Sequence, residues 1–405
     1  MKKSILSYKQ IMGFLSCLML CSASFTAVSC SDDDDNNKSN GNNDLTEEEA
    51  QAIDYTSEYA DAWGNYTLNV AKLLADDSKK LYNEWNNGFA NDFKNHTAAS
   101  GYSSAIACVQ QIIEGCEDIA NEVGTAKIGE PVDFWTGGQQ NKALYAVESW
   151  YSWHSRDDYK NNIQSVANSL LGERLTTSPD KFEYNPATVN QASIIAKCMM
   201  NNTLQPQSIK VWKAVCAAWT AIDNIPQPFR NNIGSDEAAA AMEACATLNT
   251  ELETLEGQIS SNLSEEDAQA IVDRFVDNVA LPTYKDLAEK NEALLTAVRA
   301  FKNSPSNAAF EAACTAWLEA RQPWETSEAF LFGPVSKLGL DPNMDSWPLD
   351  AIGIANLLKS QNWAEMEWNG TYDEENEAIQ AAQSLRGYHT LEFLLFKNGK
   401  ARTVK

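Results

Sequence analysis

Apolar side chains recur every three or four positions along most of this 405-residue chain. Thr46 and Glu49 have the spacing of a capping box, which marks the start of a helix. The stripe of an amphipathic helix then runs through Tyr55, Tyr59, Ala62, Trp63, Tyr66 and Val70 and continues through Leu74, Leu81 and Trp85. Further helices are predicted near 104–119, 144–151, 157–172, 187–200, 207–222, 236–260, 264–279, 284–301 and 306–318. Because no alternating strand with a hairpin turn accompanies them, the sequence predicts an all-α protein of long antiparallel helices packed in bundles.

The composition narrows the classes of ligand. Apolar residues make up 44% of the chain, enough for a large buried core, and the net charge is −25. An acidic protein is a poor partner for nucleic acid, because phosphate binding needs a basic surface. Cations, neutral ligands and other proteins stay open. The chain has three histidines, His96, His154 and His389, and a zinc site built mainly on imidazole would need nearly all of them.

The first thirty residues have the pattern of a targeting segment. Two lysines precede the apolar run 11–21, which is too short to be predicted as a membrane-spanning helix. The stretch Ala-Val-Ser-Cys at 27–30 resembles the lipobox of bacterial lipoproteins. Residues 1–30 are therefore predicted to be a signal peptide, with Cys30 carrying the lipid. Ordinary signal cleavage nearby is the alternative.

Residues 31–50 contain eight acidic residues and one lysine and are predicted to be a flexible tether. The run Ser-Asp-Asp-Asp-Asp at 31–35 resembles the surface-export signal of lipoproteins in the Bacteroides group, although a plain solvated acidic spacer has the same composition. We therefore expect an outer-membrane lipoprotein exposed on the cell surface, with membrane lipid as a partner through Cys30.

Residues 386–396 predict a buried helix that carries two polar side chains. Leu391, Phe393, Leu394, Leu395 and Phe396 cover nearly every side of this helix. His389 and Glu392 are three positions apart and share a face. A buried glutamate is costly unless it is paired, hydrogen-bonded or metal-bound, so groups from elsewhere in the fold should meet it. A structural polar pair bonded to the backbone fits the pattern equally well. Asn398 and Gly399 are expected to end the helix as a C-cap.

The segment 332–350 is a long connection rich in Gly, Pro and Asp, and it contains Asp345-Ser346-Trp347-Pro348. Structured loops of this length are more often functional than idle. The alternative is a crossover that caps a bundle, with Trp347 as a plug.

Several motifs in one order resemble the imelysin-like family. Gly387-x-His389-x-x-Glu392 is the G-x-H-x-x-E signature of that family. The other matching segments are Leu281-Pro-Thr-Tyr284, Ala316-Trp317 with Arg321 and Trp324, Glu328-Ala-Phe330, Phe332-Gly-Pro334 and Asp345-x-Trp347-Pro348. Residues 264–405 resemble the first half of the family.

The order of the two halves departs from the family. The signature helix normally lies near the middle of an imelysin-like chain, whereas here the chain ends soon after it. Residues 51–260 look like the missing second half. The matching letters are Glu148-Ser149-x-x-Ser152, Asp158-x-x-x-Asn162-Ile163 and Gly172. We infer a circular permutation, which is reasonable because chain termini lie at surfaces and are often close together.

The resemblance implies a fold and the position of a site. The fold would be two similar four-helix bundles packed side by side, with the site at their interface around the signature helix. The expected metal- or ligand-binding residues are His389, Glu392, Arg386, Gly387, Asp345 and Trp347, with Ser152, Arg156, Asp158 and Asn162 from the other bundle. Arg156 is expected to neutralise Glu392 or to hold an anionic ligand. The alternative for the polar residues is an ordinary surface position or helix cap.

Three functions are compatible with these features. The resemblance implies a non-catalytic protein of iron uptake that binds iron or an iron-containing ligand and meets iron-transport components, and oxygen and imidazole ligands suit iron. A zinc metallopeptidase that uses His389 and Glu392 is the alternative, and it would need a third ligand and an open position for water. A surface scaffold that binds partners is the third. We expect a monomer that does not bind nucleic acid.

Overall fold

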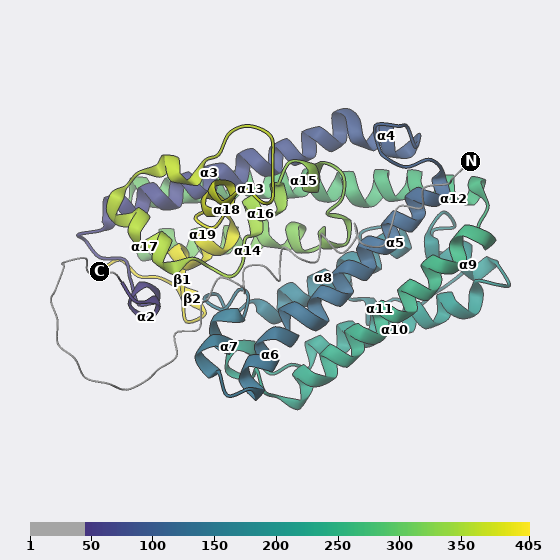
Figure 1. Ribbon diagram of the computed structural model, residues 1–405, viewed down its shortest axis with the longest axis horizontal. Helices are drawn as coiled ribbons and strands as arrows, with labels where there is room; N and C mark the ends of the chain where they lie inside the picture. The colour runs from purple at the N-terminus through teal and green to yellow at the C-terminus, as the bar shows by residue number, and fades with distance from the viewer. Residues whose placement is uncertain (1–44) are drawn as a thin grey trace.

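Four helices form one bundle in the computed structural model, which describes residues 45–405. They are α5 (Ala105–Glu122), α8 (Ser155–Leu171), α10 (Gln205–Asp223) and α11 (Asp236–Asn262). Neighbours pack in the order α5, α8, α10, α11 and back to α5, and they occupy the lower right of Figure 1. The hydroxyls of Ser104 and Ser235 accept hydrogen bonds from the first turns of α5 and α11, which fixes where these two helices begin.

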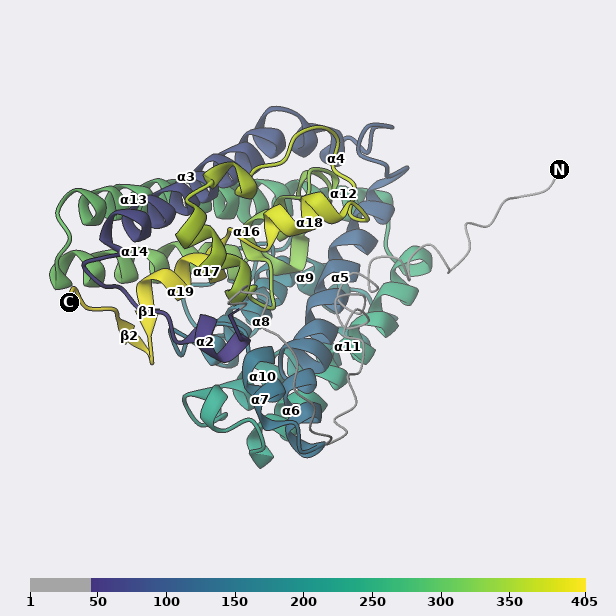
Figure 2. The same ribbon diagram turned by 60° about the vertical axis from the view of Figure 1, so that its left-hand side comes forward.

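A second group of helices combines the two ends of the described chain. Its members are α3 (Ala60–Glu84), α13 (Leu281–Asn303), α14 (Asn307–Glu325) and α19 (Tyr388–Leu395). Helix α13 packs along both α3 and α14, and α19 lies against α3 and α14. Figure 1 shows the early helix α3 in purple beside the much later α13 in green, and Figure 2 shows the same neighbours from another side.

Continuous helical rods connect the two groups. Helix α12 (Glu265–Phe275) packs on α5, and the wider turn η6 (Val276–Ala280) leads from it directly into α13. In the same way α3 continues through η2 (Trp85–Phe89) into α4 (Ala90–Lys94), and α4 contacts α12. The buried apolar residues of both groups form one cluster without a break. The two groups of helices therefore share one core.

Shorter elements fill the rest of the fold. The other helices are α2 (Glu47–Gln51), α6 (Gly129–Thr136), α7 (Gln140–Ala146), α9 (Ile194–Met200), α15 (Pro334–Lys337), α16 (Leu340–Asp345), α17 (Ala351–Ser360) and α18 (Glu377–Gln383). Short helical turns are η3 (Val123–Lys127), η4 (Pro179–Lys181), η5 (Phe229–Asn231), η7 (Glu328–Phe330) and η8 (Trp363–Met366). Strands β1 (Phe396–Lys397) and β2 (Lys400–Ala401) pair antiparallel, with Phe396 opposite Ala401.

The all-α prediction is confirmed, but some local expectations are wrong. The helix expected at 144–151 ends at Ala146, and the chain then turns through residues 147–154 with positive φ at Ser149 and Trp153. Asn398 and Gly399 do not cap α19, which ends at Leu395. They form the hairpin turn between β1 and β2, where both have positive φ.

The structure differs from the predicted division of the chain at two places. Residues 47–51, at the end of the expected tether, form α2, which begins at the predicted capping box of Thr46 and Glu49. Ala50 is fully buried against α17, so this part of the tether is folded. Helix α3 packs with the later helices rather than with the rest of 51–260.

Other expectations about the organisation of the chain stay predictions. The signal peptide, Cys30 and the acidic run at 31–35 lie outside the described residues. The order of the two halves stays a prediction as well. Within residues 45–405, no helix combines the length and apolar character that crossing a membrane requires.

Candidate functional site

Helix α19 starts at a backbone position that only glycine occupies without strain. Gly387 has a φ of 95°, and a Cβ there would lie 2.6 Å from the carbonyl oxygen of Met344. This close approach brings the first turn of α19 against the end of α16. His389 and Glu392 follow on one face of α19, and both are completely buried. The prediction of a buried helix with two polar side chains is confirmed.

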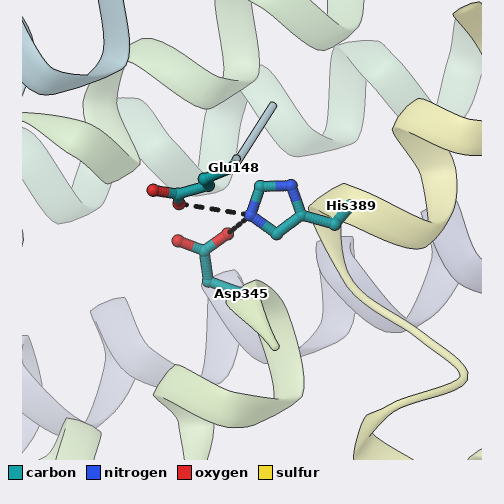
Figure 3. Close-up of side chains that lie close together, drawn as sticks. All are labelled: Glu148, Asp345 and His389. Atoms are coloured by element: carbon teal, nitrogen blue, oxygen red, sulfur yellow. Dashed lines mark hydrogen bonds and ion pairs between the residues drawn. The ribbon is translucent and has the colours of Figure 1, made fainter. Parts of the chain in front are cut away.

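The imidazole of His389 lies between carboxylates from three segments of the chain. Its Nε2 atom is 3.2 Å from Oε1 of Glu148 and 3.1 Å from Oδ1 of Asp345. Its Nδ1 atom is 3.3 Å from Oε2 of Glu392. Figure 3 shows Glu148 and Asp345 converging on the same ring nitrogen. Glu148 comes from the turn after α7 and Asp345 from the end of α16, so the site forms only when these segments meet α19.

Arg321 on α14 provides the fixed positive charge of the cluster. Its buried guanidinium is 2.8 Å from Glu148 and 2.6 Å from Glu325, 3.4 Å from Asp158, and it also forms an ion pair with Asp345. One guanidinium therefore meets four carboxylates. Carboxylates removed from water need such compensation, because the charged form is costly in the interior.

The charges around His389 shift its titration and that of its neighbours. Burial alone would raise the pKa of Glu148, but Lys127, His389 and Arg321 lower it to about 2. The pKa of Asp345 is also lowered, because Arg321 and His389 outweigh its burial. Burial and Arg321 oppose a charge on His389, yet Asp345 and Glu148 raise its pKa well above the usual value. The site therefore holds an imidazolium between ionised carboxylates.

A second part of the cluster lies around Lys127. Its ammonium is 3.2 Å from Glu148 and 3.8 Å from Glu122. Burial raises the pKa of Glu328 well above the usual value, and it raises the pKa of Asp341 to about 7 with help from nearby Asp345. This region therefore has more carboxylates than cations to neutralise them.

Three of the residues predicted from the other bundle join the cluster. The backbone N–H and the hydroxyl of Ser152 both donate to Oε1 of Glu392 at 2.7 Å. Asp158 accepts from the Ser149 hydroxyl at 2.6 Å and faces Nδ1 of His154 at 2.7 Å. Asn162 donates to Oε2 of Glu325 at 2.6 Å. Ser152, a predicted partner of the signature helix, thus contacts it through two hydrogen bonds.

Two tryptophans hold the remaining sides of the site. Trp347 stands edge-on to His389 with ring centroids 4.8 Å apart, and its indole N–H donates to the carbonyl of Ala146 at 3.1 Å. Trp324 donates from its indole to Oδ2 of Asp345 at 2.6 Å. Trp347 is half-buried, whereas His389 is fully buried.

Two predicted residues lie away from His389. Arg156 does not neutralise Glu392, because its guanidinium donates to the carbonyls of Asp223 and Ile225. It precedes the inward-facing Asp158 by two positions, and such residues do not share a face of a helix. Arg386 precedes the first turn of α19 and is buried, but its guanidinium pairs with Asp77 on α3 and donates to the carbonyl of Met366.

Sequence reasoning missed several members of the cluster. Glu148 and Arg321 appeared within family motifs, but neither was assigned to the site. Glu325 is four residues after Arg321 on α14, a spacing that places a buried ion pair on one face. The sequence did contain a sign of this pair. Trp317 and Trp324, which flank Arg321 on α14, are fully buried, so an arginine and a glutamate on the same side of this helix would be buried as well.

Replacing Gly387 by alanine should lower the free energy of unfolding by about 2–3 kcal/mol. The left-handed backbone and the clash with the Met344 carbonyl both oppose a Cβ at this position. Chemical denaturation at neutral pH measures the change. Gly257→Ala is the matched control, since a Cβ there meets nothing within 4 Å in the middle of α11, and it should be neutral or slightly stabilising. Equal effects of the two changes would contradict the strain at Gly387.

The donor set fits a metal ion. Ligand atoms of Glu148, Asp345 and His389 all lie within 4.8 Å of one another, and so do those of Glu325, Glu328 and Asp345. Carboxylate and imidazole ligands suit iron, manganese and zinc.

A family model and a solved structure name the same family. The sequence model of the family described as imelysin matches residues 33–255 and 280–405. The crystal structure of an imelysin peptidase from Bacteroides ovatus superposes with a TM-score of 0.82 at 47% identity, covering 88% of this chain and all of that chain. The iron-regulated protein A of Synechococcus elongatus is 34% identical over 122 residues, about 30% of each chain. A putative iron-regulated protein A precursor from Parabacteroides distasonis is 34% identical over 38% of this chain and 42% of its own, with a TM-score of 0.34.

Proposed function

Because this chain belongs to the imelysin family, we propose that it binds an iron ion at the His389 cluster and serves bacterial iron uptake without catalysing a reaction. The observation that carries the proposal is the convergence of Glu148, Asp345 and His389 in a buried cluster with surplus carboxylates. The name of the Synechococcus relative, an iron-regulated protein, points in the same direction. Iron in this proposal is the cargo.

The residues of the site would have different roles in binding a cation. Glu148 and Asp345 would supply carboxylate oxygens, and His389 would supply its Nε2 nitrogen. Glu392, fixed by two hydrogen bonds from Ser152, faces the other ring nitrogen and would hold the imidazole in position. An imidazolium cannot ligate, so binding a cation would release the proton that His389 now shares with the carboxylates.

The surroundings of the site favour storage or transfer of an ion over peptide hydrolysis. His389 and Glu392 are fully buried, and Trp347 packs against the His389 ring. A peptidase needs a cleft that admits a peptide and a free carboxylate to act as a general base. Glu392 accepts two hydrogen bonds from Ser152, so it is not free to act as that base.

Anaerobic calorimetric titration with Fe²⁺ tests the proposal. The wild-type protein should bind Fe²⁺ stoichiometrically, and His389→Ala should weaken the affinity by about 100-fold or more, since even supporting residues around a metal are worth 10–100-fold. The wild-type affinity should rise between pH 6 and pH 8, because binding displaces a proton. His96→Asn is the matched control, because His96 lies outside the cluster and its side chain makes no hydrogen bond within the described part of the chain, residues 45–405.

Two results would contradict the proposal. Absence of stoichiometric binding, or an affinity unchanged in His389→Ala, would remove the direct metal site. Cleavage of casein that a chelator stops and that Glu392→Gln abolishes would favour the metallopeptidase instead.

A further inference from the structure

A second group of carboxylates lies beside the His389 cluster and shares Asp345 with it. Oxygens of Glu325, Glu328 and Asp345 lie within 4.8 Å of one another. Glu325 is fully buried, Glu328 is 7% exposed, and the side chain of Asp345 is 4% exposed. The two groups therefore form a continuous buried row in which Asp345 is the common member.

Glu328 is the unexplained member of this row. Within residues 45–405, its carboxylate has no hydrogen bond and no ion pair, although it points toward Glu325 and Asp345. Arg321 pairs with four other carboxylates, and Lys127 pairs with Glu148 and Glu122, so Lys127 acts on Glu328 only from beyond ion-pair distance. A buried carboxyl group that makes no hydrogen bond is costly whether it is ionised or protonated, so its position beside two other carboxyl groups points to a ligand.

Close packing and a hydrogen bond fix the backbone around Glu328. Gly115 on α5 lets the two segments approach so closely that a Cβ there would lie 2.3 Å from the carbonyl of Ala329. The backbone N–H of Ala329 donates to the hydroxyl of Ser165 on α8 at 3.0 Å. Asn162, also on α8, fixes Glu325 from the other side. The carboxylates of this group are thus positioned by three helices rather than by a free loop.

We propose that Glu325, Glu328 and Asp345 bind a second divalent cation, next to the ion at the His389 cluster and bridged to it by Asp345. An all-carboxylate set selects an oxygen-preferring ion such as Mn²⁺ or Fe²⁺. This inference rests on the proposed function, because Asp345 belongs to both positions. It assigns the protein a capacity of two ions, and Glu328 becomes the residue that separates a two-ion site from a one-ion site.

Titration with Mn²⁺ alone, followed by the electron paramagnetic resonance signal of the free ion, counts the bound ions in the full chain. Wild-type protein should bind two Mn²⁺, and Glu328→Gln should bind one. Glu328→Asp, which keeps the charge but shortens its reach, should weaken the second ion at least tenfold. Glu311→Gln, an exposed change on α14, should retain two. Thermal unfolding shows that each variant is folded.

The outcomes separate this inference from the proposed function. One bound ion in the wild type that is lost in His389→Ala but kept in Glu328→Gln would overturn the second position and leave the first. Two ions in both wild type and Glu328→Gln would also overturn it. No bound ion in the wild type, by this method and by Fe²⁺ titration, would overturn the proposed function and the inference with it.

Discussion

Replacing Arg321 by methionine should lower the free energy of unfolding by about 3–5 kcal/mol at pH 7. Methionine has a similar reach and no charge, so the change leaves Glu148, Asp158, Glu325 and Asp345 buried without their shared cation. Removing one partner of a buried ion pair typically costs this much, because the remaining charge has lost its compensation. Here a single substitution affects four partners. Urea denaturation followed by circular dichroism measures the loss.

The loss should shrink as the pH falls from 8 to 5. In the wild type the pKa of Glu148 is about 2, so Glu148 stays ionised over this interval and its contribution is lost only as the pH falls from about 4.5 toward 2. Without the guanidinium, the pKa values of Glu148 and Asp345 rise, and protons then replace the missing cation. The variant should therefore gain stability relative to the wild type on acidification.

Arg299→Met is the matched control for this change. Arg299 lies on the exposed side of α13, 3.9 Å from Glu292 with both side chains largely exposed. Exposed pairs contribute about 0–1 kcal/mol, and the control should show no matching pH dependence. A similar loss in both variants, or a loss in Arg321→Met that grows on acidification, would contradict the assignment of Arg321 as the counterion of the cluster.

The site could be predicted from sequence where the signal was local. An apolar run that surrounds His389 and Glu392 requires burial of both residues, and the structure buries both. Asp158 and Asn162 are four positions apart on one face of α8, and both point inward. The prediction for His389 and Glu392 needed only the period of a helix and the cost of a buried charge, whereas Asp158 and Asn162 were predicted from the resemblance to the family.

The features of the site that were not predicted correctly depend on tertiary contacts. Glu148 reaches His389 from a turn in which Ser149 and Trp153 have positive φ, although neither residue favours that conformation. The local pattern around Leu144 and Trp150 is helical, and only the packing of the turn against α19 overrides it. For the same reason the partner of Glu392 was misassigned to Arg156, whereas a serine backbone N–H meets it.

The sequence also did not reveal which helices pack together. The periodicity of α3 predicts an amphipathic helix but carries no information about which helices it will meet. In the structure its stripe faces α13 and α19, more than two hundred residues later in the chain. Tyr66 on α3 donates to the carbonyl of Leu385, just before the signature helix. The support of α19 therefore comes partly from the beginning of the folded chain.

Replacing Trp63 by alanine should lower the free energy of unfolding by about 3–5 kcal/mol, because it removes a fully buried indole that joins α3 to α19. The indole N–H donates to the carbonyl of Leu394 at 2.9 Å, and the ring stacks near Phe393 and beneath the guanidinium of Arg402. The loss combines a large cavity with an unsatisfied carbonyl, and urea denaturation measures it. Trp135→Ala, at a 38% exposed indole on α6, should cost far less. If Trp63→Ala were as mild as this control, α3 would not be a structural part of the bundle that holds the signature helix.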